Sequence, residues 1–217
     1  MNHTSLASPT IPVADHDGLI PVASLSQDIE VHVPVWSYSN PGDTFQLLLN
    51  GQLTGATQQL PSPIPPIGTE LRITLNRQAL AEDGLYEVSY RATNVLGGIS
   101  ADSPPRQIRI DRTSPGGALL APMIFPGATF GHHLIGLLPG YAGMEPGDTI
   151  QTLCNGVPGP QHVVQPDELT LRPIEIVFDR EALKDLGTDN VSMSYTVTDR
   201  AGNESISSMA LVMSLTL

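Results

Sequence analysis

Hydrophobic and polar residues alternate in several short segments of this chain. Residues 29–35 (IEVHVPV) and 86–93 (YEVSYRAT) place an apolar residue at nearly every second position. A period of two is that of a β-strand with one face against a core and the other in water. The pattern therefore predicts antiparallel sheets with one buried face.

Turn residues bound the predicted strands. Asn40 to Asp43 (NPGD) predicts a type II turn, because proline fixes φ at its second position and glycine supplies a positive φ at its third. Residues 44–49 form the next predicted strand, and Asn50-Gly51 is typical of a hairpin. Further strands are predicted at 71–75 and 107–110, and short helical turns at 77–84 and 180–187.

Proline interrupts the pattern between two of these strands. Residues 52–68 contain four prolines, and proline cannot donate to a ladder, so we expect most of this stretch to be an exposed loop. Its counterpart later in the chain, with Pro158, Pro160 and Pro166, is expected to be equally irregular.

The sequence repeats itself. PGDTFQLLLNG at 41–51 recurs as PGDTIQTLCNG at 146–156, and 146 − 41 gives an offset of 105. The same offset relates Tyr90 to Tyr195 in the clearest alternating strand. A duplication of about one small-domain length predicts two domains in tandem. The predicted division is a flexible lead-in at 1–18, a first domain at 19–113 and a second at 114–217, joined through the polar segment 111–117.

Each repeat holds about seven short predicted strands separated by turn residues. That is the profile of an immunoglobulin-like sandwich. Twenty prolines and twenty glycines, spread along the chain, agree with many short elements. The predicted fold class is all-β, with two tandem immunoglobulin-like β-sandwich domains.

The net charge and the N-terminal sequence indicate which binding partners and which cellular location to expect. The net charge is −12 and no basic patch is present, which argues against nucleic acid and anionic membrane as partners. No apolar run is long enough for membrane insertion, and the N-terminus lacks the features of a secretory signal peptide. We expect a protein at the cell surface or secreted by a route independent of a signal peptide, or a cytoplasmic one if the chain is complete as written.

Four segments carry a family resemblance. They are 41–51, 80–90 (LAEDGLYEVSY), 146–156 and 195–205 (YTVTDRAGNES). These resemble the bacterial Ig-like repeats of very large surface and secreted proteins, including biofilm-type adhesins. The resemblance implies further Ig-like repeats as neighbours. The segment EDGLYEV also resembles the tyrosine corner of immunoglobulin folds, in which the hydroxyl of Tyr86 would bond to the backbone; Val191 stands at that place in the second repeat.

Two sets of residues are candidates for binding. Asp199, Asn203 and Glu204, with Asp111 in the linker, offer hard oxygen ligands of the kind that calcium prefers. The alternative is a hydrogen-bonded turn with exposed acids, because no calcium-loop motif is present. Trp36 and Tyr141 occupy equivalent positions, and each is either a core aromatic or a platform for a sugar ligand.

Two aspartates and the cysteine are expected to stabilise the fold and not to bind a ligand. Asp43 and Asp148 follow Pro-Gly and are expected to accept hydrogen bonds from turn amides. The single cysteine, Cys154, lies in a strand pattern and is expected to be a small buried group.

The sequence holds no catalytic constellation or cofactor fingerprint. It predicts a non-enzymatic module, with no cofactor unless calcium binds, that acts as a spacer or interaction segment of a larger bacterial surface, secreted or toxin-associated protein in an adhesion-type role. The alternative is a module that binds a carbohydrate or protein partner through the loops at one end of a sandwich.

Overall fold

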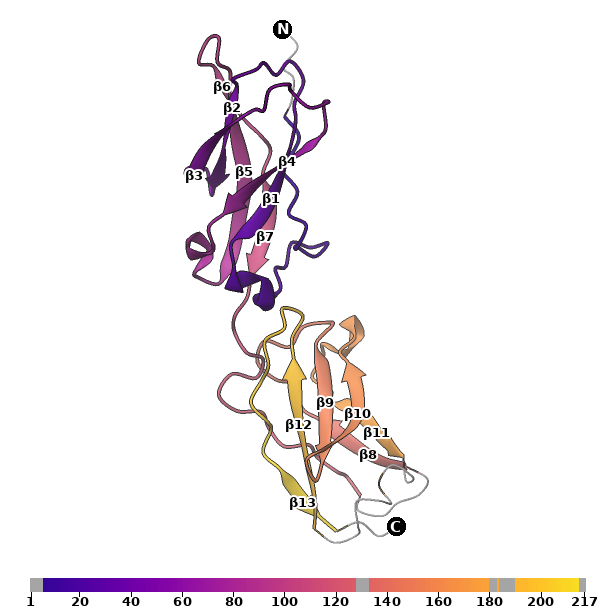
Figure 1. Ribbon diagram of the computed structural model, residues 1–217. Helices are drawn as coiled ribbons and strands as arrows, with labels where there is room; N and C mark the ends of the chain where they lie inside the picture. Colours follow the sequence, from indigo (N-terminus) through magenta and orange to yellow (C-terminus); the bar gives the residue numbers. More distant parts are fainter. Residues whose placement is uncertain (1–5, 128–132, 180–182, 184–189, 215–217) are drawn as a thin grey trace. The chain divides into compact units, whose positions relative to one another are not determined.

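The computed structural model describes residues 6–127, 133–179, 183 and 190–214. The chain divides into two compact units, residues 1–112 (unit 1) and 113–217 (unit 2), each built of strands around its own core (Figure 1). The predicted all-β fold with tandem sandwiches is confirmed. No helix among the described residues is long and apolar enough to cross a membrane.

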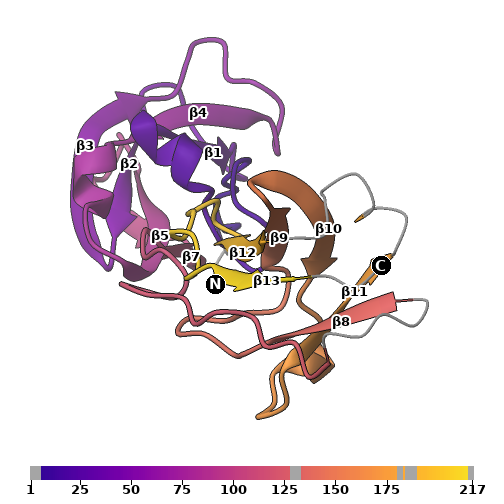
Figure 2. The same ribbon diagram turned by 90° about the horizontal axis from the view of Figure 1, so that it is seen from below.

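Unit 1 contains two sheets. In the first, β1 (Ile29–Pro34) pairs antiparallel with β4 (Glu70–Leu75). The second has the order β3 (Gln52–Gln59), β2 (Thr44–Leu49), β5 (Gly84–Thr93), and β5 also pairs with β6 (Ser100–Asp102) and β7 (Arg106–Ile110). Two short 3-10 helices, η1 (Val22–Ser26) and η2 (Arg77–Leu80), complete the unit. Figure 2 shows β1 and β4 on one side of unit 1 and β2, β3 and β5 on the other.

The core of unit 1 lies between these sheets and follows the alternation in the sequence. Val88, Tyr90 and Ala92 of β5 are buried, as are Val31 and Val33 of β1. Side chains of this kind contribute about 1.5–3 kcal/mol each when they leave water. The alternating pattern therefore places one face of each strand against the other sheet.

Both predicted turn types are confirmed. The amide of Asp43 donates to the carbonyl of Asn40 at 3.0 Å, and Gly42 has a φ of 93°. Asn50 and Gly51 between β2 and β3 both have positive φ, 50° and 77°. This backbone matches the right-handed twist of the flanking strands and closes a tight hairpin.

The loop predicted over residues 52–68 is wrong for its first half. Residues 52–59 form β3, which pairs antiparallel with β2, because the tight turn before it returns the chain directly alongside. The four prolines come after this strand. In unit 2 the corresponding β10 (Val157–Val163) tolerates its prolines as an edge strand, with a register shift between Pro158 and Gln161.

The flexible lead-in predicted over residues 1–18 is also wrong for the residues that the structure describes. Leu6 and Ile11 belong to the hydrophobic core of unit 1. Thr10 exchanges backbone hydrogen bonds with His32 of β1, at 2.9 and 2.8 Å, and Ile20 donates to the carbonyl of Arg109 at 3.0 Å. The segment 6–20 (the N-terminal segment below) therefore contacts both sheets, and its buried apolar side chains hold it there.

Unit 2 repeats the arrangement. Its first sheet pairs β8 (His133–Leu138) with β11 (Ile174–Asp179), and its second has the order β10, β9 (Thr149–Cys154), β12 (Val191–Thr198), β13 (Leu211–Met213). A 3-10 helix, η3, spans Pro166–Glu168. The Asn-Gly hairpin recurs, with φ of 52° at Asn155 and 78° at Gly156. The helical turn predicted at 180–187 lies outside the described residues except for Leu183, which is buried.

Candidate functional site

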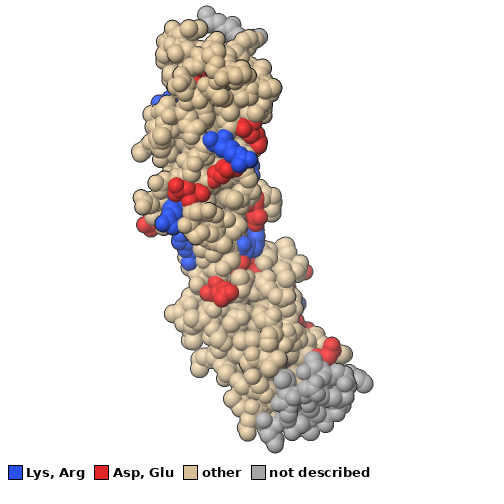
Figure 3. Space-filling view, in the orientation of Figure 1, with Lys and Arg blue, Asp and Glu red and all other residues tan. Residues whose placement is uncertain are grey.

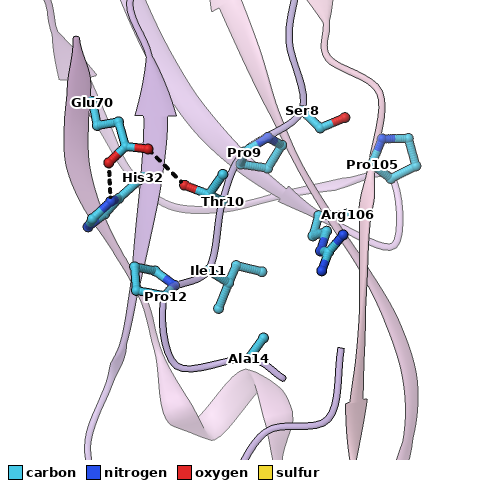
Figure 4. Close-up of a pocket in the computed structure, with 10 residues that line it drawn as sticks. All are labelled: Ser8, Pro9, Thr10, Ile11, Pro12, Ala14, His32, Glu70, Pro105 and Arg106. Carbon is cyan, nitrogen blue, oxygen red and sulfur yellow. Dashed lines mark hydrogen bonds and ion pairs between the residues drawn. The ribbon is translucent and has the colours of Figure 1, made fainter. Parts of the chain in front are cut away.

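A groove in unit 1 is the candidate site that the structure adds to the sequence. It has a volume of about 730 Å³ and lies along the N-terminal segment (Figure 4). Pro9, Ile11 and Pro12 supply its apolar surface, and Arg106 at the start of β7 lies across from them. The sequence does not predict this groove, because it predicts residues 1–18 to be a flexible lead-in that does not pack on the sandwich. The apolar Leu6 and Ile11 were the signal that the segment packs.

One wall of the groove is a network of ion pairs. His32 lies between two carboxylates, with Nε2 2.6 Å from Oε1 of Glu30 and Nδ1 2.7 Å from Oε2 of Glu70. The hydrogen bond to Glu30 is the largest cause that raises the pKa of His32, and the hydrogen bond and charge of Glu70 add to it. The hydroxyl of Thr10 donates to Oε1 of Glu70 at 3.2 Å. The network therefore ties the N-terminal segment to both strands of the first sheet.

The opposite wall is formed by Pro105 and by the exposed Arg106 at the start of β7. Gln107, which is also exposed, follows directly after this wall. Within the described part of the chain, no carboxylate forms an ion pair with Arg106. On the face drawn in Figure 3, basic and acidic side chains of unit 1 alternate without forming a basic patch.

Trp36 and Tyr141, the predicted ligand-binding aromatics, pack against the cores. Trp36 is partly buried, with its ring centroid 6.2 Å from those of Phe45 and Tyr90. Tyr141 is also partly buried, and its hydroxyl donates to Oδ2 of Asp148 at 2.8 Å. Burial first, then this hydrogen bond, raises the pKa of Tyr141. The geometry favours the core-aromatic interpretation of both residues over a sugar platform.

Asp43 and Asp148 accept turn hydrogen bonds, as predicted, but they differ in detail. Asp43 accepts the amide of Asn40 on Oδ2 and that of Val95 on Oδ1, both at 2.9 Å. Asp148 accepts the Glu145 amide and the Tyr141 hydroxyl on Oδ2, while its buried Oδ1 accepts nothing from the described residues. Burial is the main cause that raises the pKa of Asp148.

The predicted calcium ligands form a turn. Asp199 accepts hydrogen bonds from the amide and the side-chain Nδ2 of Asn203, both at 2.8 Å, and Glu204 forms a bridge with Thr198. Asp111 belongs to unit 1 and the other three to unit 2. In the described ranges, no three His, Cys, Asp or Glu side chains come together to hold a metal ion. The arrangement matches the hydrogen-bonded alternative.

The loops at one end of unit 1 expose large apolar side chains. The loop between β1 and β2 and the loop between β5 and β6 lie together, because Thr44 pairs with Thr93 and the amide of Val95 bonds to Asp43. Tyr38 is 83% exposed, Leu96 82% and Ile99 75%. The equivalent turn of unit 2, DRAGN at 199–203, is polar and glycine-containing apart from the buried Ala201.

Cys154 is confirmed as a buried core residue. It is 2% exposed within the core of unit 2. Burial raises the pKa of its thiol, which keeps the sulfur protonated and unreactive at neutral pH.

Comparison with known proteins bears on the fold. No protein-family model matches the chain, and no curated protein does. A solved structure of a 1.5-MDa bacterial ice-binding adhesin, studied for its retention on the host cell surface, matches 97% of this chain at 18% identity with a TM-score of 0.51. The likeness shows the fold. The match covers 64% of that chain, so this chain spans less than two thirds of its length.

A second structure matches over most of both chains. The fibronectin(III)-like modules of CbhA from Clostridium thermocellum are 15% identical, with a TM-score of 0.46, over 95% of this chain and 93% of theirs.

Proposed function

We propose that this chain is a non-enzymatic pair of Ig-like domains that acts as a spacer and interaction segment of a larger bacterial surface or secreted protein, in an adhesion-type role. One observation carries the proposal. Each unit closes a complete hydrophobic core of its own, and the units follow each other directly at Arg112 and Thr113. Modules with separate cores and a short connection extend a chain at a fixed length per repeat.

The use of the buried polar groups supports a structural role. Asp43, Asp148 and Asn203 are the kind of buried polar residues from which enzymes build sites. Here they accept or donate hydrogen bonds in turns that join strands. The fold shared with part of a bacterial adhesin agrees with this assignment. In a toxin-associated protein the pair of domains would have the same spacer role.

The location and the neighbours are part of the proposal. We expect the chain to lie at the cell surface or outside the cell and to adjoin further Ig-like repeats. Antibodies against unit 1 should then label intact cells of the source organism. Labelling only after the cells are permeabilised would place the protein in the cytoplasm and contradict the proposal.

Pulling single molecules tests the spacer role directly. Stretching the full chain should give two separate unfolding events. About 105 residues extend to about 370 Å at about 3.5 Å per residue, so each event should lengthen the chain by that amount less the length of the folded unit. A single event of twice that length would show that the two units unfold as one body. That result would contradict a chain of independent spacer modules.

The exposed apolar loops of unit 1 favour a second function, binding of a carbohydrate or protein partner. Tyr38, Leu96 and Ile99 expose more apolar surface than the loops of a sandwich need for folding. A glycan array and a surface-protein array probed with the chain should show signals that the Tyr38→Ser, Leu96→Ser double variant loses. A signal that the variant retains would contradict binding by these loops.

A further inference from the structure

The outer edge of β7 is open at its start. Arg109 donates its amide to the carbonyl of Gly18 at 2.8 Å and accepts from Ile20 at 3.0 Å, so its backbone groups face the N-terminal segment and not β5. In an antiparallel pair the direction of these groups alternates from residue to residue. Gln107, two residues earlier, therefore turns its N–H to the same side. Gln107 is exposed, and the described residues place no acceptor on this N–H.

The N-terminal segment presents a second open edge to the same groove. Thr10 uses both its backbone groups on His32, so the neighbouring Pro9 and Ile11 turn theirs the other way. The carbonyl of Pro9 and the amide of Ile11 are thus directed away from β1. Figure 4 shows this stretch with His32 and Glu70 on one side and Pro105 and Arg106 on the other. The open edge of the N-terminal segment therefore lies across the groove from Pro105 and Arg106, which directly precede Gln107.

Unit 2 shows how the same place is closed. Met209, just before β13, donates its amide to the carbonyl of Leu120 at 3.4 Å, and Leu120 is fully buried. The residue of unit 1 equivalent to Met209 is Pro104 (209 − 105), and Pro105 follows it. Proline has no amide hydrogen, so Pro104 cannot donate the hydrogen bond that Met209 donates in unit 2.

The charges in the groove indicate the partner. On one wall, Glu70 and His32 form an ion pair with each other. On the other wall the exposed guanidinium of Arg106 has no carboxylate partner in the described ranges, and it presents several donors in a planar fork that matches a carboxylate. Pro9, Ile11 and Pro105 offer apolar surface between the two walls. The groove thus combines unpaired strand edges, an apolar floor and one free positive charge.

We propose that this groove binds an extended peptide segment of a partner protein, which adds as a β-strand beside β7 and places an Asp or Glu side chain against Arg106. The backbone would bond to the N–H of Gln107 and to Pro9 and Ile11 across from it, as in recognition by strand addition. The stretch from Ser8 to Ile11 spans about 13 Å at roughly 3.3 Å per residue, which suits a segment of about four to six residues. The site is independent of the spacer role, so this proposal and the pulling experiment fail separately.

The test is a bead library of random heptapeptides with capped ends, screened with the full fluorescent chain. The selected peptides should share an acidic residue at one fixed position. Their carbonyl oxygens should accept hydrogen bonds from the amides of Gln107 and Ile11, which protects these two amides from hydrogen exchange when the peptide is bound. Selection of no peptide above background, or protection confined to other parts of the chain, would overturn the proposal.

Three variants separate the contributions of the Gln107 N–H and the Arg106 charge to peptide binding. Gln107→Pro removes the outward N–H and should lower the affinity for the selected peptides at least tenfold. Arg106→Glu should change the preferred charge from acidic to basic. Val212→Pro removes the equivalent amide of β13 in unit 2 (107 + 105) and should leave binding unchanged. Binding that neither unit 1 variant alters would overturn the site, and if Gln107→Pro does not fold, the charge reversal at Arg106 decides alone.

Discussion

The hydroxyl of Tyr86, at the start of β5, donates a hydrogen bond to the carbonyl of Glu82 at 2.9 Å. The contact joins the strand to the turn that precedes it, and the ring packs against the core of unit 1. It is the tyrosine corner expected from the segment EDGLYEV. In unit 2, Val191 lies at the equivalent position and is fully buried, so this unit holds its corner by apolar packing.

Removing this hydroxyl should destabilise unit 1 alone. Tyr86→Phe keeps the ring and loses one hydrogen bond, which lowers the free energy of unfolding by about 1 kcal/mol. Trp36 is the only tryptophan and lies in unit 1, so its fluorescence during urea unfolding follows that unit. Val191→Ala in unit 2 is the control and should leave the Trp36 transition unchanged. An unaltered transition in Tyr86→Phe would show that the contact contributes nothing.

The strands and turns of this fold follow closely from the sequence because their signals are local. Alternation over 86–93 fixes which face of β5 is buried, and Asn-Gly fixes the hairpin after β2. Within 52–68 the prolines exclude a strand only where they stand, which is after the residues that pair with β2. A tight hairpin pairs the residues immediately after it, whatever follows later.

The groove could not be predicted for a different physical reason. It depends on where the N-terminal segment packs, and a few scattered apolar residues, among them Leu6, Ile11 and Ile20, hold that segment in the core. Long-range packing of so few residues leaves no periodic pattern in the sequence. The hydrogen bond that Pro104 cannot donate likewise becomes clear only by comparison with the bond from Met209 to Leu120 in the other unit.

The ion pairs of His32 should make the stability of unit 1 depend on pH. The folded pKa of His32 is raised above its usual value, chiefly by the hydrogen bond to Glu30, so its contribution is complete below about pH 6.5 and is lost as the pH rises through the folded pKa. The pKa of Glu30 is lowered by the same bond, so its own contribution is lost as the pH falls through that lower value.

The comparison is between the unchanged chain and His32→Gln, by urea unfolding followed at Trp36. The difference in stability between them should be larger at pH 5.5 than at pH 8.5. Arg72→Gln is a useful control, because it removes another cation beside Glu30, at 3.6 Å, and leaves His32 in place. A difference that is constant or grows with pH would contradict the assignment of charge to His32.

Calcium should not stabilise the turn at Asp199. Both carboxylate oxygens already accept hydrogen bonds from Asn203, and a bound ion would have to compete with them. Melting curves in millimolar calcium and in chelator should therefore coincide. A ligand that binds only the folded state raises the melting temperature, so a shift with calcium that Asp199→Asn removes would establish the calcium site instead.

Equivalent aspartates in the two repeats should lose different amounts of stability on the same substitution. Asp43 uses both carboxylate oxygens on amide donors, so Asp43→Asn replaces one acceptor with a donor and should cost about 2 kcal/mol. Asp148 has one buried oxygen with no donor from the described residues, and burial raises its pKa. Because the folded pKa lies above the unfolded one, the carboxylate becomes less favourable for folding as the pH rises through that value.

Asp148→Asn should therefore cost less than about 1 kcal/mol at pH 8, and less there than at pH 4, since the amide oxygen can still accept from Tyr141 and Glu145 while the buried charge is gone. Calorimetry resolves the two units, and Trp36 fluorescence assigns the transition of unit 1. Tyr141→Phe provides the matched control, because it removes one donor to Asp148 and keeps the charge. If both aspartate variants lose the same stability at both pH values, the two turns are energetically alike despite their different hydrogen bonds.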